Sequence, residues 1–378
     1  MLPTHSGEGC CGCRGGKCHN FTKSCRNFFR LTNTYEDVSS LQMFYLLLRF
    51  TGFYCPTKAW IYELYRYLIL TAMIFNFCDR VYFYAKIDDL VWIIFTAFFI
   101  ALWYYGKILF KLKILDKLLT REEFQREENK RYILRFKKQA IRLMFIVGGI
   151  SMTLWVLHTI QYASWEELKT VPKKYHPLYI IADRVGWFYN YLHAIICIVV
   201  TFLILNIHFV QLKILGRDLV GMEFSNTPED YERVVVRHSE IERILTKSSD
   251  TLGHLIGVGL TSLLLKLWIS ISCVFEKDST ILNVVWIILS VSIYLGLLLK
   301  VGQINANREI LEALMYKNTT IKQEGRLLII EYLKANQITL YVFGISVTLN
   351  LICKVTFLFA NVGLGLAITI LKTNIFGK

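Results

Sequence analysis

Several signatures of enzymes and of soluble binding domains are missing from this 378-residue sequence. No Gly-rich phosphate loop, catalytic carboxylate dyad or nucleophile–base pair stands out in it, which disfavours an enzyme. No basic stripe interleaved with stacking aromatics occurs in a polar segment, so nucleic acid is not expected as a partner despite a net charge of +14. Charged residues make up only 19% of the chain and hydrophobic residues 54%. These values favour a chain in largely apolar surroundings.

The N-terminal segment lacks two further features. Its five cysteines do not have the spacing of a zinc motif, so neither a metal nor a cofactor is expected; they are Cys10, Cys11, Cys13, Cys18 and Cys25. The segment also lacks the short apolar run of a cleaved signal peptide, and we expect the first span to act as its own insertion signal. Residues 1–40 are expected to form a disordered cytoplasmic tail with reduced thiols.

Long apolar segments are what the sequence has in abundance, and its mean hydropathy is +0.41. A helix that crosses a bilayer core needs about 20 mostly apolar residues. Seven segments meet this requirement, which predicts an all-α integral membrane protein formed by residues 41–378. The expected spans are 60–84, 90–110, 140–162, 187–212, 253–275, 281–299 and 352–371. Residues 41–54 are too short to span and are expected to lie at the membrane surface.

The basic residues predict the orientation of these spans. The N-terminal segment and the second, fourth and sixth loops carry 30 Lys and Arg, against 9 on the opposite side. Because the side that is richer in Lys and Arg usually faces the cytoplasm, we expect a cytoplasmic N-terminus and an extracellular C-terminus in the plasma membrane. A G-protein-coupled receptor has the opposite orientation.

The inner loops are long and have a helical repeat. Residues 231–245 place Val234, Ile241 and Leu245 near one face, with charges elsewhere. Residues 305–340 show a similar pattern through Ile310, Leu314, Leu327, Ile330 and Leu333. We therefore expect the helices to continue into the cytoplasm and to pack together there.

The last apolar run, 338–371, is too long for one span, at roughly 50 Å for 1.5 Å per residue. A break around 344–350 predicts a submerged half-helix, followed by the span 352–371. Small and polar residues in that span suit close packing and a wet lumen. The candidate pore-lining residues are Asn361, Gly365, Thr369 and Lys372.

This layout resembles the insect odorant/gustatory chemoreceptor superfamily. The opening segment LLLRFTGFYCP, the long basic second loop, the RHSEIERIL helix before the fifth span and the split last run all match it. The best-known gustatory signature is Thr-Tyr, five hydrophobic residues and Gln-Phe. Here Gly365-Leu366 and Lys372-Thr373 flank the hydrophobic spacer 367–371. The spacer is kept and all four signature residues are replaced, so the branch stays open between an odorant receptor, a diverged gustatory receptor and a non-conducting relative.

The resemblance implies a ligand-gated cation channel of four identical or different subunits, with a pore lined by the last helix. It further implies anchoring by cytoplasmic helical extensions and, for odorant receptors, a shared co-receptor subunit. A small organic odorant or tastant would bind in the outer half between spans two, three, four and six. Lys372 would ring the pore mouth and repel cations, unless it points away, lies in the aqueous vestibule or is diluted by other subunits.

Aromatic and hydroxyl side chains recur at helical spacing near the outer ends of these spans, where they suit a pocket for an organic ligand. Packing between helices and anchoring at the membrane interface are the alternative roles. The candidate pocket residues are Trp92, Phe95, Ser151, Trp155, His158, Tyr191, Ile195, Trp286, Ser290 and Tyr294.

Charged and titratable residues also lie inside the apolar spans. Lys266 and Lys354 are expected to face protein or water, because a charge in lipid is costly. His193 and His208 are too far apart in sequence to suggest a zinc site and are expected to pack between helices. A membrane carrier remains the main alternative function, although carriers often have internal repeats and the sequence shows only one long broken run.

Overall fold

The computed structural model describes residues 48, 51, 60–85, 90–111, 129–161, 176–221, 227–275, 281–354, 356–357 and 361. Almost all of these residues are helical, as the composition predicts. The helices are α3 (Trp60–Ala85), α4 (Leu90–Lys111), α7 (Lys130–Gln161), α8 (His176–Gly221), α9 (Pro228–Phe275), α10 (Ile281–Asn305), α11 (Asn307–Lys317) and α12 (Gln323–Ala335). The predicted surface helix 41–54 and most of the predicted span 352–371 lie outside the described residues.

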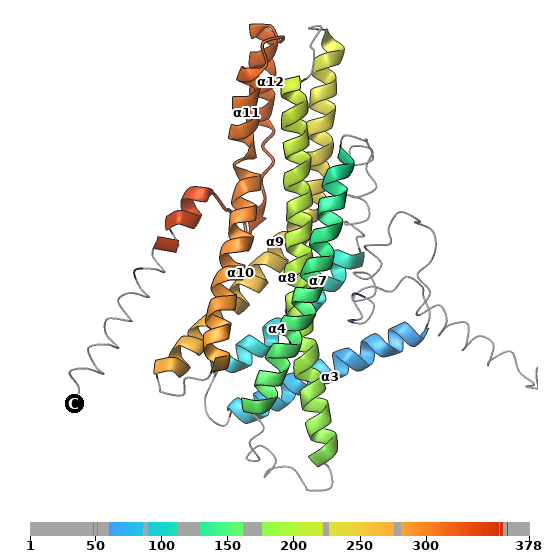
Figure 1. Ribbon diagram of the computed structural model, residues 1–378, viewed down its shortest axis with the longest axis vertical. Helices are drawn as coiled ribbons and strands as arrows, with labels where there is room; N and C mark the ends of the chain where they lie inside the picture. The colour runs from blue at the N-terminus through green and yellow to red at the C-terminus, as the bar shows by residue number, and fades with distance from the viewer. Residues whose placement is uncertain are drawn as a thin grey trace, which may run out of the picture.

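Helix α8 is the axis of the molecule (Figure 1). It packs against α3, α4, α7, α9, α10 and α11. At about 1.5 Å per residue, its 46 residues measure roughly 70 Å, and the 48 residues of α9 are slightly longer. Both helices exceed a hydrocarbon core of about 30 Å, so each must continue beyond the membrane. Pro228 starts α9, where the missing N–H of proline costs no hydrogen bond.

Four helices in the described part of the chain are long and apolar enough to cross a membrane. The qualifying segments are Leu134–Leu157 of α7, Tyr179–Val220 of α8, Ser249–Ile269 of α9 and Ile288–Asn305 of α10. Helix α7 presents Phe145, Ile146, Met152 and Val156 outward. Exposed apolar side chains of this kind are at home against lipid tails. The chain is therefore a multi-pass membrane protein.

One end of the molecule, which we call the helical extension, consists of residues 212–221 of α8, 228–248 of α9, α11 and α12 (upper part of Figure 1). Here α11 packs against α8 and α12, and α12 packs against α9. Val234, Ile241 and Leu245 are buried, which confirms the predicted face of α9. The amide of Asn318, between α11 and α12, donates a hydrogen bond to the Leu219 carbonyl at 2.7 Å.

The predicted apolar face of 305–340 is partly wrong. Ile330 and Leu333 are buried, whereas Ile310 and Leu327 are 46% and 49% exposed. The buried face of α11 instead carries Leu311 and Met315. The helical repeat restarts at α11 and again at α12, so a single repeat drawn through the whole segment misplaces its apolar face.

The segment before the last span contains no half-helix, contrary to the prediction. Residues 337–340 are irregular and are followed by an antiparallel hairpin of β1 (Tyr341–Val342) and β2 (Ile345–Ser346), with Tyr341 opposite Ser346. Phe343 and Gly344, between the strands, have φ values of 51° and 76°, and two-residue hairpin turns often need positive φ at both positions. The expected break is real, but it begins at the end of α12.

Residues 337–348, which we call the hairpin segment, are fixed to α9 and α10. The side chain of Asn305, at the end of α10, donates to the carbonyls of Leu340 and Val347 at 3.0 and 2.9 Å and accepts from the Leu340 N–H at 2.8 Å. Gly253 on α9 lets the strand approach, because a Cβ there would overlap the Tyr341 carbonyl oxygen. Helical structure resumes at residue 349 after Thr348, whose hydroxyl accepts from the Leu351 N–H at 3.2 Å.

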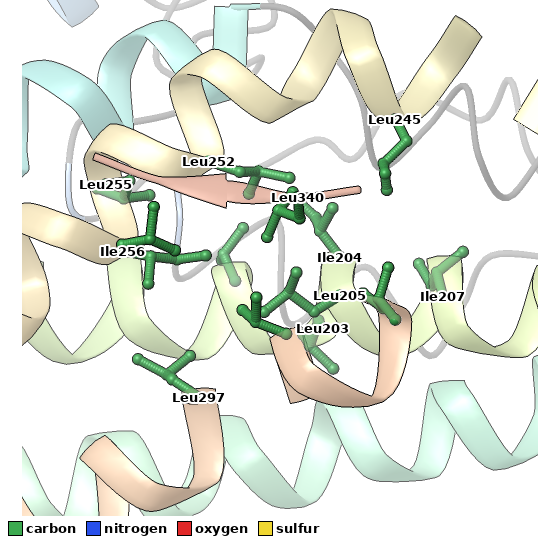
Figure 2. Packing of buried hydrophobic residues seen from close by; sticks show 14 of the residues in the cluster. Leu203, Ile204, Leu205, Ile207, Leu245, Leu252, Leu255, Ile256, Leu297 and Leu340 are labelled. Atoms are coloured by element: carbon green, nitrogen blue, oxygen red, sulfur yellow. The ribbon is translucent and has the colours of Figure 1, made fainter. Parts of the chain in front are cut away.

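Part of the apolar core lies where α8, α9 and the hairpin segment meet (Figure 2). Leu340 is fully buried, and Figure 2 shows it between Leu252 of α9 and Ile204 of α8. Leu297 of α10 belongs to the same cluster. The short segment before the last span is therefore built into the centre of the helix bundle.

Candidate ligand-binding site

Four buried aromatic side chains from three helices form one cluster, which we call the aromatic cluster: Phe99 of α4, Trp187 and Tyr191 of α8, and Trp286 of α10. The Phe99 ring lies 6.2 Å, centroid to centroid, from both Trp187 and Tyr191, edge to face. Tyr191 lies 5.4 Å from Trp187 and 5.5 Å from Trp286. These separations are those of favourable aromatic pairs, so Tyr191 is the centre of the cluster.

Helical periodicity explains how the cluster is assembled. Trp187 and Tyr191 are four residues apart on α8, and side chains at that spacing share one helix face. Trp286 and Ser290 share a face of α10 for the same reason. Helix α8 packs directly against both α4 and α10, which brings the three sets of side chains together.

Lys266 of α9 adds a cation to the aromatic cluster. It lies within an apolar membrane segment and is only 5% exposed. Its ammonium nitrogen is 5.5 Å from the centre of the Trp286 ring, within the distance of a cation–π interaction. The expectation that this lysine faces protein is confirmed. Lys354, in contrast, is exposed.

Two buried polar groups on one face of α10 lack a hydrogen-bond partner among the residues that the structure describes. They are the indole nitrogen of Trp286 and the hydroxyl of Ser290. The buried hydroxyl of Ser151 on α7 also lacks one. An indole N–H can only donate, whereas a hydroxyl can both donate and accept. A buried polar group without a partner costs free energy, so a ligand that supplies acceptors would be stabilised here.

The structure brings together some of the predicted pocket residues. Tyr191 and Trp286 are in contact, and Ser290 lies one turn from Trp286. Ile195 is buried one turn from Tyr191, and Tyr294 is partly buried two turns from Trp286. Whether this set binds a ligand stays a prediction.

Trp155 has structural contacts of its own. Its indole nitrogen donates to the Arg184 carbonyl at 3.0 Å, and its ring packs edge to face on Phe188 at 6.0 Å. It therefore helps to hold α7 against α8. Ser151, one turn away on α7, is buried.

Several predicted site residues cannot be placed by their side chains. Trp92 and Phe95 lie on α4 and His158 on α7, but their side chains lie outside the described part of the structure. Among the predicted pore residues, Asn361 is helical and exposed. Gly365, Thr369 and Lys372 lie outside the described residues.

Sequence reasoning missed Phe99 and Trp187 and did not join Lys266 to the pocket. A signal for two of them was present, because Phe99 is four residues from Phe95 and Trp187 is four residues from Tyr191. Periodicity shows which residues share a face, but it does not show which face of a uniformly apolar helix meets its neighbours.

A second polar feature, which we call the α3–α8 polar ladder, was also missed. The buried amide of Asn76 donates to the Asp183 carboxylate at 2.9 Å and accepts from the Asn190 amide at 3.0 Å. The Tyr179 hydroxyl donates to the Asp79 carboxylate at 2.8 Å. Gly186 allows the close approach, since a Cβ there would lie 2.8 Å from the Ala72 carbonyl oxygen. Hydrogen bonds and small residues of this kind join helices in lipid.

Two of the histidines of α8, His193 and His208, are buried between helices. His193 is fully buried, and its Nδ1 and Nε2 lie 2.6 Å from the carbonyl oxygens of Tyr189 and Thr51. His208 is also fully buried. Within the described residues no group of three or more His, Cys, Asp or Glu could hold a metal ion.

No protein-family model matches the sequence, and no curated protein matches it. Solved structures do match. The structure of the insect olfactory receptor OR5 from Machilis hrabei has a TM-score of 0.64 and 11% sequence identity, and the match covers 86% of this chain and 97% of that one. The structure of the same receptor in complex with eugenol matches equally well, with 12% identity over 88% of this chain. The similar structures are those of a receptor and not of an enzyme. The resemblance seen in the sequence is thereby confirmed in the fold, and this multi-pass membrane chain has the architecture of an insect olfactory receptor.

Proposed function

We propose that this chain is a chemosensory receptor subunit that forms a ligand-gated, non-selective cation channel for small organic odorants or tastants. The observation that carries the proposal is the match of fold to an insect olfactory receptor over nearly the whole chain. The eugenol complex of that receptor supports a small organic ligand for this chain.

The proposed topology has seven spans, a cytoplasmic N-terminus and an extracellular C-terminus. Six spans lie on α3, α4 and α7–α10, and the seventh is 352–371. The excess of Lys and Arg on the side of the helical extension supports a cytoplasmic extension. With this orientation, the aromatic cluster lies in the outer half of the membrane, since Trp286 is near the start of α10 and Lys266 is near the end of α9.

Four subunits are proposed to surround one pore, either as identical chains or together with a co-receptor subunit. The last helix lines the pore and the helical extension joins the subunits. Asn305 and Gly253 support a mechanical role for the hairpin segment, because they tie it to α10 and α9 directly before the last helix. A shift of α9 or α10 on ligand binding is therefore transmitted to the start of the pore helix.

Electrophysiology tests this proposal. Oocytes expressing the full chain, alone and with an insect co-receptor subunit, are exposed to panels of odorants and tastants under voltage clamp. The expected result is a ligand-evoked current that reverses near 0 mV with mixed Na⁺ and K⁺, as a non-selective cation pore requires. Concentrative uptake of a ligand without a channel current would support a carrier instead. Silence of surface-expressed protein towards both panels would overturn the proposal.

A further inference from the structure

We propose that the ligand of this chain is a small organic acid, and that Lys266, Trp286 and Ser290 bind its carboxylate. This inference rests on the proposed function, which it extends by naming the class of ligand. Lys266 of α9 lies over Trp286 of the aromatic cluster, and Ser290 is one turn from Trp286 on α10.

The first argument is the position of Lys266, which lies inside a membrane-spanning segment of α9. A lysine is costly in such a segment, and residues of this kind usually mark a functional site. Lys266 is buried among protein side chains and lies over Trp286. The face of an indole ring attracts a cation, so the contact with Trp286 offsets part of the cost of burying the ammonium group.

The second argument is that the polar groups here are rich in donors. The ammonium group and the Trp286 indole N–H donate hydrogen bonds and accept none, and the Ser290 hydroxyl can donate. The indole nitrogen and the hydroxyl are buried and have no partner among the described residues. A ligand that fits this set presents acceptors and a negative charge, and a carboxylate presents both.

The third argument separates acids from amines. An aromatic cluster alone would suit an organic cation, because ring faces attract positive charge. With Lys266 already over Trp286, a ligand ammonium would be repelled at short range. Phe99, Trp187 and Tyr191 then remain to contact the hydrocarbon part of the acid. The arrangement selects a small arylalkyl acid over the corresponding amine.

The test uses four compounds with one skeleton: phenylacetic acid, methyl phenylacetate, 2-phenylethanol and 2-phenylethylamine. Binding to the purified full chain in lipid nanodiscs is measured by tryptophan fluorescence at neutral pH, and currents are measured in oocytes. We expect the acid to bind most tightly and the amine most weakly. Lys266→Met should weaken binding of the acid by about ten- to a hundredfold, as expected for a lost charge-assisted hydrogen bond, and should leave binding of the alcohol within about threefold.

Three further variants sharpen the test. Lys266→Arg keeps the charge and should retain most of the acid preference. Trp286→Phe keeps a ring but removes the indole N–H, and should weaken binding of the acid several-fold. Lys300→Met is the matched control. Lys300 is on α10, as Trp286 is, and it also lies over aromatic rings, those of Phe202 and Phe209 on α8. It should bind the acid as the wild type does. Lys266→Met removes a buried charge from the membrane, so failure to fold is not expected.

The outcomes separate this inference from the proposed function. Equal affinities across the panel, preference for the amine, no binding of the acid, or equal losses in Lys266→Met and Lys300→Met would each overturn the inference. Acid binding that depends on Lys266 without any current would sustain the inference and count against a channel. Currents evoked only by neutral compounds would sustain the channel and overturn the inference.

Discussion

The helical extension and the membrane-spanning part of the molecule are built in opposite ways. In the extension most buried side chains are apolar, such as Ile241, Leu311 and Leu333, as in a soluble helical domain. The membrane-spanning part exposes large apolar side chains such as Phe145 and buries polar ones such as Asn76. Lipid tails solvate apolar side chains as well as a protein core does, so polar contacts and close packing hold helices together there. The same chain is therefore stabilised by different forces at its two ends.

The largest effect is expected in the core of the extension. Leu311→Ala removes a side chain that is 1% exposed and packs near Gly216 of α8, so it should lower the stability by about 2–5 kcal/mol. The neighbouring change Ile310→Ala affects an exposed side chain and should cost about 0.5 kcal/mol or less. Thermal unfolding of the detergent-purified variants measures the difference. Equal losses at both positions would contradict the assigned face of α11.

A somewhat smaller effect is expected for the polar ladder. Asn76→Leu removes the amide that donates to the buried carboxyl group of Asp183. It should cost about 1–3 kcal/mol, because that buried group loses a hydrogen-bond partner. Thr71→Val on the same helix is the control, since the Thr71 hydroxyl is exposed and bonds only to its own helix, at the Tyr67 carbonyl. Thermal unfolding again reports the loss. If Asn76→Leu were neutral, apolar packing alone would hold α3 to α8.

A loss of stability of similar or smaller size is expected at the glycine contact between α9 and the hairpin. Gly253→Ala places a Cβ against the Tyr341 carbonyl oxygen, and such overpacking typically costs about 1–3 kcal/mol. Gly149→Ala is the matched control, because nothing lies within 4 Å of a Cβ there. Alanine favours a helix over glycine by about 1 kcal/mol, so this control should be neutral or stabilising. Equal changes of melting temperature in Gly253→Ala and Gly149→Ala would contradict the close approach of the hairpin to α9.

The smallest effect concerns pH and His238 in the extension. Burial against α12, where its ring packs edge to face on Tyr332, lowers the pKa of His238 from about 6.5 to about 4. The unfolded chain therefore binds a proton more readily than the folded one, so stability is complete above pH 6.5 and falls as the pH drops towards 4. At pH 6 the loss should be about 1 kcal/mol.

Melting curves between pH 7.5 and 5 measure this slope. His238→Leu should flatten it, whereas the same change at the exposed His254 should leave it in place. A slope that persists in His238→Leu would assign the acid sensitivity to another group.

The sequence predicts the extension better than the membrane-spanning part, for physical reasons. Around Val234 and Ile241 only one face is apolar, so the repeat points to the core. Near Phe99 every face of α4 is apolar, and the repeat cannot tell the lipid side from the protein side. The partners of Asn76, Asp183 and Lys266 lie on other helices, far away in sequence, and only the packing of those helices brings them together.

The segment before the last span shows a second reason. Residues 338–343 are apolar enough to suggest a half-helix, but an extended segment and a hairpin form instead. The backbone N–H and carbonyl of Leu340 form hydrogen bonds with the side chain of Asn305, about 35 residues earlier in the chain. The residue pattern within 338–343 cannot reveal a hydrogen bond to a residue so far away in the sequence.

The account depends most on the side of the membrane that each end of the molecule occupies. An epitope tag fused after Lys378 tests this directly by antibody labelling of intact cells, with a tag inserted after the exposed Thr319, between α11 and α12, as the internal comparison. The account predicts that the first tag is labelled in intact cells and the second only after permeabilisation. The reverse pattern would place the helical extension outside the cell and contradict the proposed receptor channel.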